Sequence, residues 1–221
     1  MAGRPHPRNR RTPDSPELVL ASTSSFRRAM LEAAGLPFRA IAPEVDESAP
    51  ANASPRRLAR VLALAKAQAV SRRFPEALVI GADQTSEVEG RLLRKPRSRA
   101  EARRQLRMLS GRAHRLHSAV ALVRQKPPLS RVEVETARLT LRHLSSTQLE
   151  AYLDTGEWEG CVGGYRIEGR GIQLMAAVHG HYHTIVGLPL IRLLCMLVAA
   201  GFPLLQECPD ARPSRRAGTK P

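Results

Sequence analysis

The chain has 221 residues, of which 43% are hydrophobic, and it carries a formal net charge of +15. This length allows one large domain or two small lobes around a hydrophobic core, and no apolar stretch is long enough to cross a bilayer. The three cysteines are widely spaced and form no CxxC pair, which argues against a disulfide framework or a structural zinc site and predicts a cytoplasmic location.

The two ends of the chain are predicted to be tails. Residues 1–16 are rich in proline and arginine and lack the apolar core of a secretory signal, so a disordered basic tail is expected; residues 204–221 are expected to form a flexible tail. Basic tails either stay solvated or bind polyanions. Because only 4% of the residues are aromatic, stacking platforms for single strands are scarce. We therefore favour the solvated interpretation and expect neither nucleic acid nor a membrane as a partner.

Strands and helices alternate in the first half of the chain. The predicted elements are a strand at 17–21, a helix at 26–34, a strand at 38–42, a helix from Ser54-Pro55 to about Arg73, and a strand at 77–82. A serine followed by proline is a typical helix start. The last strand is uniformly apolar, which predicts burial on both faces and an end at Asp83.

The second half continues the alternation. We predict a helix at 99–109, a hairpin of strands at 117–124 and 132–141, a helix at 146–153, a glycine-rich segment at 163–171, and a helix that Gly187-Leu188-Pro189 opens and that runs to Ala200. There is no internal repeat, so the order of elements predicts an α/β fold. Enzymes of this class usually keep their sites at strand-to-helix turns.

The first candidate site is the polar turn at residues 22–25. Small hydroxyl residues follow a strand, and a helix begins with Arg27 and Arg28 in its first turn. Free backbone N–H groups at a helix start attract phosphate, and an anionic ligand would offset the unfavourable positive charge there. A serine N-cap with two surface arginines explains the pattern equally well, so both interpretations stay open.

The second candidate is Asp83 together with Lys66 and Lys95. A carboxylate after a buried strand can hold a divalent metal or accept a proton from water, and an ammonium nearby can neutralise phosphate. Taken singly, a turn-capping aspartate and solvated lysines are the simpler interpretation. However, the chain has only four lysines among 35 basic residues, and two of them lie here.

Two further groups are candidate metal ligands: the acids Glu44, Asp46 and Glu47, and the histidines His179, His181 and His183. Three neighbouring acids can bind Mg²⁺ or form a solvated loop. The histidines alternate as in an exposed strand, so we assign them no metal. The glycine-rich segment allows close backbone approach to a ligand, but it matches neither a dinucleotide fingerprint nor a P-loop.

Together these stretches resemble the Maf family of nucleoside triphosphate pyrophosphatases. The matching segments are LVLASTSSFRRAMLEAAGLPF, APEVDE, LALAKAQAV, VIGADQT, LLRKP, LSGRAHRLHSAVAL, GGYRIEGRGIQL and IVGLPL. They occur in the family's order over residues 17–201, and several motifs in register are more specific than any one alone. GADQ and VETARLT are most similar to the alphaproteobacterial branch.

The resemblance implies a Maf/ITPase-like α/β fold, with a long mixed sheet and two lobes around a central cleft, over residues 17–203. It implies hydrolysis of nucleoside triphosphates, modified ones included, to the monophosphate and pyrophosphate with Mg²⁺ or Mn²⁺. Asp83 matches the catalytic acid. Glu47 matches another polar site position, and we expect it to be the second metal-side carboxylate. The other matched site positions, which would bind phosphate or substrate, are Ser22, Arg27, Lys66, Lys95 and Glu168.

The chain also departs from the family pattern. Many relatives have proline at Ser25 and arginine at Phe26, glutamine at Glu168, and acids at Ala176, His179 and His181. The base preference and the oligomeric state stay open, with a homodimer among the alternatives. A non-catalytic protein on the same fold, which binds nucleic acid or regulates cell division, is the alternative function. The enzyme is preferred because the polar residues gather at predicted strand ends.

Overall fold

The computed structural model describes residues 16–46 and 54–205, so the acid Glu47 and most of both predicted tails lie outside the described residues. The fold is an α/β architecture built on a seven-stranded mixed sheet of order β2-β1-β3-β5-β6-β7, with β4 paired to β3. The strands are β1 (Leu18–Ala21), β2 (Arg39–Ile41), β3 (Leu78–Val88), β4 (Arg91–Leu93), β5 (Ala113–Arg124), β6 (Leu129–Leu141) and β7 (Met175–His179). The predicted α/β class and long mixed sheet are confirmed.

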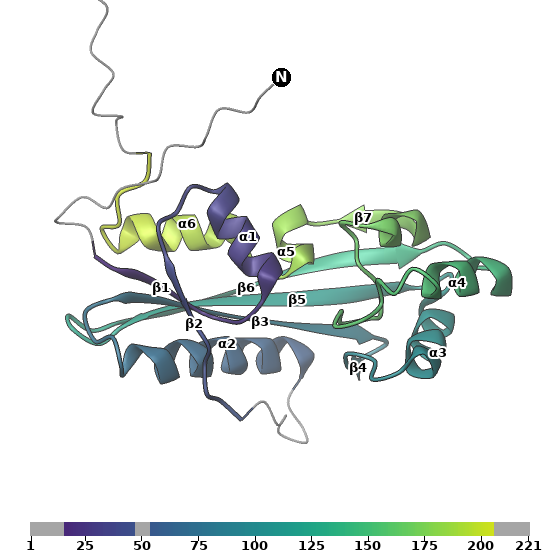
Figure 1. Ribbon diagram of the computed structural model, residues 1–221, viewed down its shortest axis with the longest axis horizontal. Helices are drawn as coiled ribbons and strands as arrows, with labels where there is room; N and C mark the ends of the chain where they lie inside the picture. Colours follow the sequence, from purple (N-terminus) through teal and green to yellow (C-terminus); the bar gives the residue numbers. More distant parts are fainter. Residues whose placement is uncertain (1–15, 47–53, 206–221) are drawn as a thin grey trace, which may run out of the picture.

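Helices cover both faces of the sheet (Figure 1). They are α1 (Ser25–Ala33), α2 (Pro55–Ser71), α3 (Arg99–Leu109), α4 (Ser146–Leu153), the 3-10 helix Arg170–Leu174, α5 (Tyr182–Val186) and α6 (Leu190–Ala199). The helices predicted at 99–109 and 146–153 match α3 and α4, and Ser54 caps α2 as expected. Within the described residues, no helix is both long enough and apolar enough to cross a membrane.

The first lobe is built on the parallel strands β2, β1 and β3. Helices α1 and α6 pack on one face, and α2 packs on the other through Ala59, Ala63 and Ala67. Gly81 of β3 makes this approach close, because a Cβ there would lie 2.1 Å from the Ala63 carbonyl oxygen. Only glycine fits such a contact, which holds α2 tightly against the middle of β3.

The second lobe is built on the far ends of the long hairpin β5–β6. Its core contains Leu106, Leu109, Leu139 and Leu153, from α3, β6 and α4. In Figure 1, α3 and α4 lie at the opposite end of the sheet from β1 and β2. The two lobes therefore share one sheet, and β3 runs from one into the other.

The predicted end of the apolar strand at Asp83 is wrong. β3 continues for five residues beyond Asp83, because β5 pairs with it antiparallel from Val79 to Glu87 and the backbone ladder does not depend on side-chain polarity. The strand that ends near Asp83 is β1, which pairs with the edge of β3 opposite β5. β1 pairs with β3 only up to Gly81, and β4 begins its pairing at Ser86. Residues 82–85 thus form an open edge in mid-sheet, between the lobes.

Four elements were not predicted: β4, β7, α5 and the 3-10 helix. Each is five residues or shorter, which is too short for a hydrophobic period to be read. The hairpin strands, in contrast, were predicted correctly, although β5 begins four residues earlier than expected.

Candidate functional site

A cavity of about 790 Å³ opens beside the unpaired edge of β3. Its lining comes from both lobes: the turn at 22–27, α2, the middle of β3, the β4–α3 connection, the segment at 160–168, and α5. Six of the site residues predicted from the sequence line this cavity: Ser22, Arg27, Lys66, Asp83, Lys95 and Glu168. The seventh, Glu47, lies outside the described residues.

Asp83 and Lys66 lie side by side in the cavity. Lys66 Nζ is 2.6 Å from Asp83 Oδ1, and the two residues are only 6% and 8% exposed. The close packing of α2 on Gly81 explains the position, because it brings the helix face that carries Lys66 next to the residue two places further along β3. The lysine is therefore part of the site and does not extend to solvent, which was the simpler interpretation of its sequence position.

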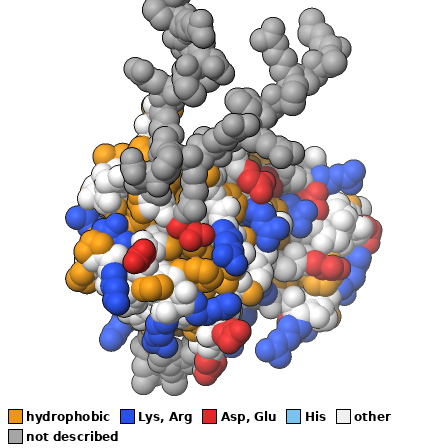
Figure 2. Space-filling view, turned by 60° about the vertical axis from the view of Figure 1, so that its left-hand side comes forward, with side chains coloured by type: hydrophobic (Ala, Val, Ile, Leu, Met, Phe, Trp, Pro, Cys, Tyr) orange, Lys and Arg blue, Asp and Glu red, His pale blue; other side chains and the backbone are white. Residues whose placement is uncertain are grey.

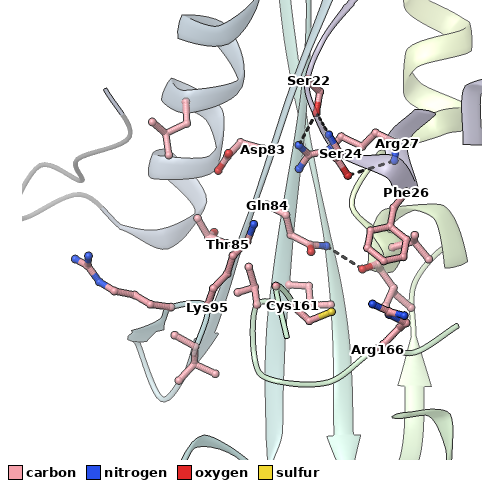
Figure 3. A pocket seen from close by; sticks show the side chains of 18 of the residues that line it. Ser22, Ser24, Phe26, Arg27, Asp83, Gln84, Thr85, Lys95, Cys161 and Arg166 are labelled. Atoms are coloured by element: carbon pink, nitrogen blue, oxygen red, sulfur yellow. Dashed lines mark hydrogen bonds between the residues drawn. The ribbon is translucent and has the colours of Figure 1, made fainter. Parts of the chain in front are cut away.

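The polar turn after β1 is organised around Arg27. Ser24 is the N-cap of α1, and its Oγ accepts the Arg27 backbone N–H at 3.4 Å. The Arg27 side chain donates to Ser22 Oγ at 3.4 Å and to the Gly187 carbonyl at 3.0 Å. Figure 3 shows the two serines and the guanidinium grouped at one end of the cavity. The serine N-cap is confirmed, but Arg27 is half-buried and is not a surface arginine, because Ser22 and Gly187 hold its side chain at the cavity. Phosphate binding at this turn stays a prediction.

Gln84 is a site residue that the sequence analysis missed. Alternation along β3 puts it on the face opposite Asp83, where its Nε2 lies 2.8 Å from Ser118 Oγ and 2.9 Å from the Ile185 carbonyl. The Gln84 hydrogen bonds anchor α5. Gly187, the residue directly after α5, accepts the hydrogen bond from Arg27. The sequence signal was a glutamine directly after Asp83. Because the strand was predicted to end at Asp83, Gln84 was not recognised as a strand residue.

Lys95 and Glu168 enter the cavity from the second lobe. Lys95 is exposed and makes no hydrogen bond or ion pair with other described residues; in Figure 3 its side chain points into the cavity. Glu168 lies 4.0 Å from the Nε atom of Arg166. Both side chains therefore stay accessible to a ligand.

The glycine-rich segment fixes the second-lobe wall. Gly163 and Gly164 have φ angles of +87° and +77°, which favour glycine. The turn they form places Tyr165 in the core, where its Oη is 2.5 Å from His114 Nε2. Burial lowers the pKa of His114 to about 4 and raises the pKa of Tyr165 well above its usual range. The next residue, Arg166, then faces the cavity.

The cavity is positively charged. Six basic and two acidic residues line it: Arg27, Lys66, Arg94, Lys95, Arg97 and Arg166, with Asp83 and Glu168. On the face of the molecule shown in Figure 2, basic side chains are instead interspersed with acidic and apolar ones. The local excess of cations suits a polyanion such as a triphosphate.

A divalent metal fits this site through Asp83. Mg²⁺ commonly takes one or two carboxylates and completes its shell with water and substrate phosphate oxygens, and Asp83 supplies such a carboxylate at the cavity wall. Among residues 16–46 and 54–205 there is no group of three or more acidic, histidine or cysteine side chains that would hold an ion alone. The expectation that His179, His181 and His183 alternate along one exposed strand is wrong: His179 ends β7, His181 precedes α5, and the half-buried His183 lies within α5.

The chain is similar to known proteins over nearly all of its described length. A family described as Maf-like protein matches residues 17–200. A nucleoside triphosphate pyrophosphatase of Rhodopseudomonas palustris is 47% identical over 186 residues, which cover 81% of this chain and 92% of the relative. A 7-methyl-GTP pyrophosphatase of Rhizobium etli is 46% identical, covering 85% and 98%. A dTTP/UTP pyrophosphatase of Symbiobacterium thermophilum is 44% identical, covering 85% and 96%.

Proposed function

The chain belongs to the Maf-like protein family, and we propose that it hydrolyses nucleoside triphosphates to the nucleoside monophosphate and pyrophosphate. Its relatives are named as pyrophosphatases of such substrates. The observation that carries the proposal is the buried Asp83–Lys66 pair, which lies 2.6 Å apart in a cavity with an excess of cations.

The reaction displaces pyrophosphate from the α-phosphorus. A water oxygen attacks that phosphorus, the bond to the α–β bridging oxygen breaks, and the proton of the water passes to a base. Asp83 is the base in this proposal, because its carboxylate is held in the cavity wall by Lys66. A positioned general base typically contributes about 10²–10⁴-fold.

The cations of the cavity stabilise the charge that moves during this step. Phosphoryl-type transfer depends mostly on positioning and charge neutralisation. Arg27, fixed by Ser22 and Gly187, offers a preorganised guanidinium. Lys66 and Lys95 add ammonium groups from opposite lobes. In this proposal Arg27 is the donor that is already in position for the leaving pyrophosphate.

We also propose that the activity depends on Mg²⁺ or Mn²⁺ held by Asp83, with Glu47 as the second carboxylate. When bound, such a cation supplies further neutralisation of the phosphates. The described residues hold no group of three or more candidate ligands, which supports a metal that arrives together with the substrate.

The test is a screen of pyrophosphate release over common and modified nucleoside triphosphates, with Mg²⁺, with Mn²⁺ and with a chelator. The reaction in ¹⁸O-labelled water should place the label in the monophosphate, because the α-phosphorus is attacked. Label in pyrophosphate, or release of inorganic phosphate and a diphosphate, would contradict the proposed reaction. Full turnover with the chelator would contradict only the metal dependence.

A further inference from the structure

Lys95 reaches the cavity from a short connection between β4 and α3. This connection, residues 94–97, runs from the buried Leu93 to Ser98, which is the N-cap of α3. Lys95 is exposed and makes no hydrogen bond or ion pair with the other residues that the structure describes. The position of its ammonium group therefore depends on how the backbone of the connection is held.

Two side chains of α3 hold that backbone on either side of Lys95. Gln105 Nε2 donates to the Arg94 carbonyl oxygen at 2.8 Å. The Arg97 backbone N–H donates to Glu101 Oε2 at 2.7 Å. Glu101 and Gln105 are four residues apart, which puts them on the same face of the helix. Lys95 thus lies between two backbone groups that are each bonded to α3.

The helix that supplies these side chains is anchored in the second-lobe core, where Ala102 and Leu106 are fully buried. The connection also packs against the glycine-rich segment. A Cβ on Gly164 would lie 3.7 Å from the Cγ atom of the buried Pro96 and 3.8 Å from the Ala102 Cα atom. Glu101 and Gln105 therefore join the backbone around Lys95 to a fixed part of the protein.

The Glu101 contact differs from ordinary helix capping. An acid or amide at the third helical position commonly accepts the backbone N–H of the N-cap residue itself. Helix α4 has this arrangement, because Gln148 Oε1 accepts the backbone N–H of its N-cap, Ser145. In α3 the carboxylate instead accepts the N–H of Arg97, the residue before the N-cap. The contact thus lies one residue closer to Lys95 than helix capping requires.

We propose that Glu101 and Gln105 are positioning residues for the hydrolysis and that they act through Lys95. Both belong to α3, outside the lining of the cavity. The inference rests on the proposed function, because it concerns how an ammonium group is held for the phosphates of a nucleoside triphosphate. Without either hydrogen bond the connection can shift, and a small displacement of a charged group in an active site lowers the rate.

The experiment combines each α3 substitution with Lys95→Ala. Gln105→Met removes the amide donor at similar length, so kcat/KM should fall about 2- to 12-fold, the factor that corresponds to one hydrogen bond. Glu101→Ala should cause a similar loss, and Glu101→Gln should restore activity because its amide oxygen also accepts an N–H. In the Lys95→Ala background the same substitutions should cause no further loss. Calorimetry with inorganic triphosphate should show the same pattern in the affinity.

A matched control separates positioning from stability. Gln148→Ala removes the capping contact of α4, so it should lower the free energy of unfolding and leave kcat/KM and triphosphate affinity unchanged. Equal fold-losses for Gln105→Met with and without Lys95→Ala, or no loss in either folded α3 variant, would overturn the positioning role. Failure of the proposed function is distinct: the wild type would release no pyrophosphate from any nucleoside triphosphate, whereas the α3 variants would still bind inorganic triphosphate more weakly.

Discussion

Lys66 Nζ lies 2.6 Å from Asp83 Oδ1, although the two residues are 17 positions apart and belong to a helix and a strand. Burying two charges costs more than their attraction often returns, so a buried ion pair is weak evidence for a stabilising role. Its position in a cavity lined by further cations supports the proposed role in the reaction.

Asp83→Asn should keep the fold and lose most of the turnover. The amide has nearly the same shape, but it neither accepts a proton at neutral pH nor binds a metal as a carboxylate does, so kcat should fall about 10²–10⁴-fold. Glu133→Gln, an exposed acid on β6, is the control and should be fully active. Steady-state kinetics with circular dichroism measure both properties. Near-normal turnover of folded Asp83→Asn would remove Asp83 from the mechanism.

Lys95→Ala should lower kcat/KM without lowering the free energy of unfolding. Lys95 is exposed at the cavity and makes no hydrogen bond with other described residues, so its removal costs no internal contact. Lys95→Arg should rescue activity only in part, because a guanidinium differs in shape and hydration. Lys126→Ala, at the exposed β5–β6 turn, is the matched control. A fully active Lys95→Arg enzyme would disprove the requirement for an ammonium.

Glu168→Gln should change which base is accepted more than it changes the phosphate chemistry. An ionised glutamate only accepts hydrogen bonds, whereas glutamine both donates and accepts. The wild type should therefore favour bases with N–H donors, such as guanine, and the variant should shift relative kcat/KM toward UTP and dTTP. Competition among GTP, 7-methyl-GTP, UTP and dTTP measures the ratios. Unchanged ratios would exclude base reading, and a uniform loss would place Glu168 with the phosphates.

Gln84→Leu should reduce both stability and activity. Its amide lies within hydrogen-bond distance of Ser118 and of the α5 carbonyls of Thr184 and Ile185. Leaving such groups without their donor costs about 1–3 kcal/mol, which urea unfolding can measure. KM should also rise, because α5 leads into Gly187, which holds Arg27. The exposed Gln173 is the control for Gln→Leu. Unaltered kinetics in destabilised Gln84→Leu would make Gln84 purely structural.

Acidification should destabilise the protein through His114. Burial lowers its pKa from 6.5 to about 4, so between these pH values the unfolded chain binds a proton that the folded chain refuses. Stability from this group is therefore lost as pH falls from 6.5 toward about 4, by up to about 3 kcal/mol. Burial also lowers the pKa of His117. His117 therefore adds to the loss of stability as the pH falls.

Urea unfolding of the wild type and of His114→Gln measures this effect at about pH 5 and about pH 7. The substitution should make the difference in the free energy of unfolding between the two pH values smaller. The remaining difference should include the contribution of His117. An equally steep dependence in His114→Gln would assign the acid sensitivity to other groups.

Much of the architecture was encoded locally. Ser54-Pro55 predicted the start of α2, the helix predicted at 99–109 matches α3, and the apolar run before Asp83 marked the buried strand. These signals are readable because capping side chains bond to backbone groups within three residues. The order of motifs was likewise enough to predict the family and the hydrolase class.

The tertiary structure alone decided how the site is assembled. Asp83 faces the cavity because β1 ends at Ala21, which pairs with Gly81 two residues before Asp83. The β3 sequence does not reveal how long its neighbouring strand is. Lys66 reaches Asp83 because glycine lets α2 approach, and Phe26 meets Arg166 across 140 residues. Such contacts depend on packing between distant segments, so local patterns, which report only near neighbours, determined the residues of the site but not which of them would meet.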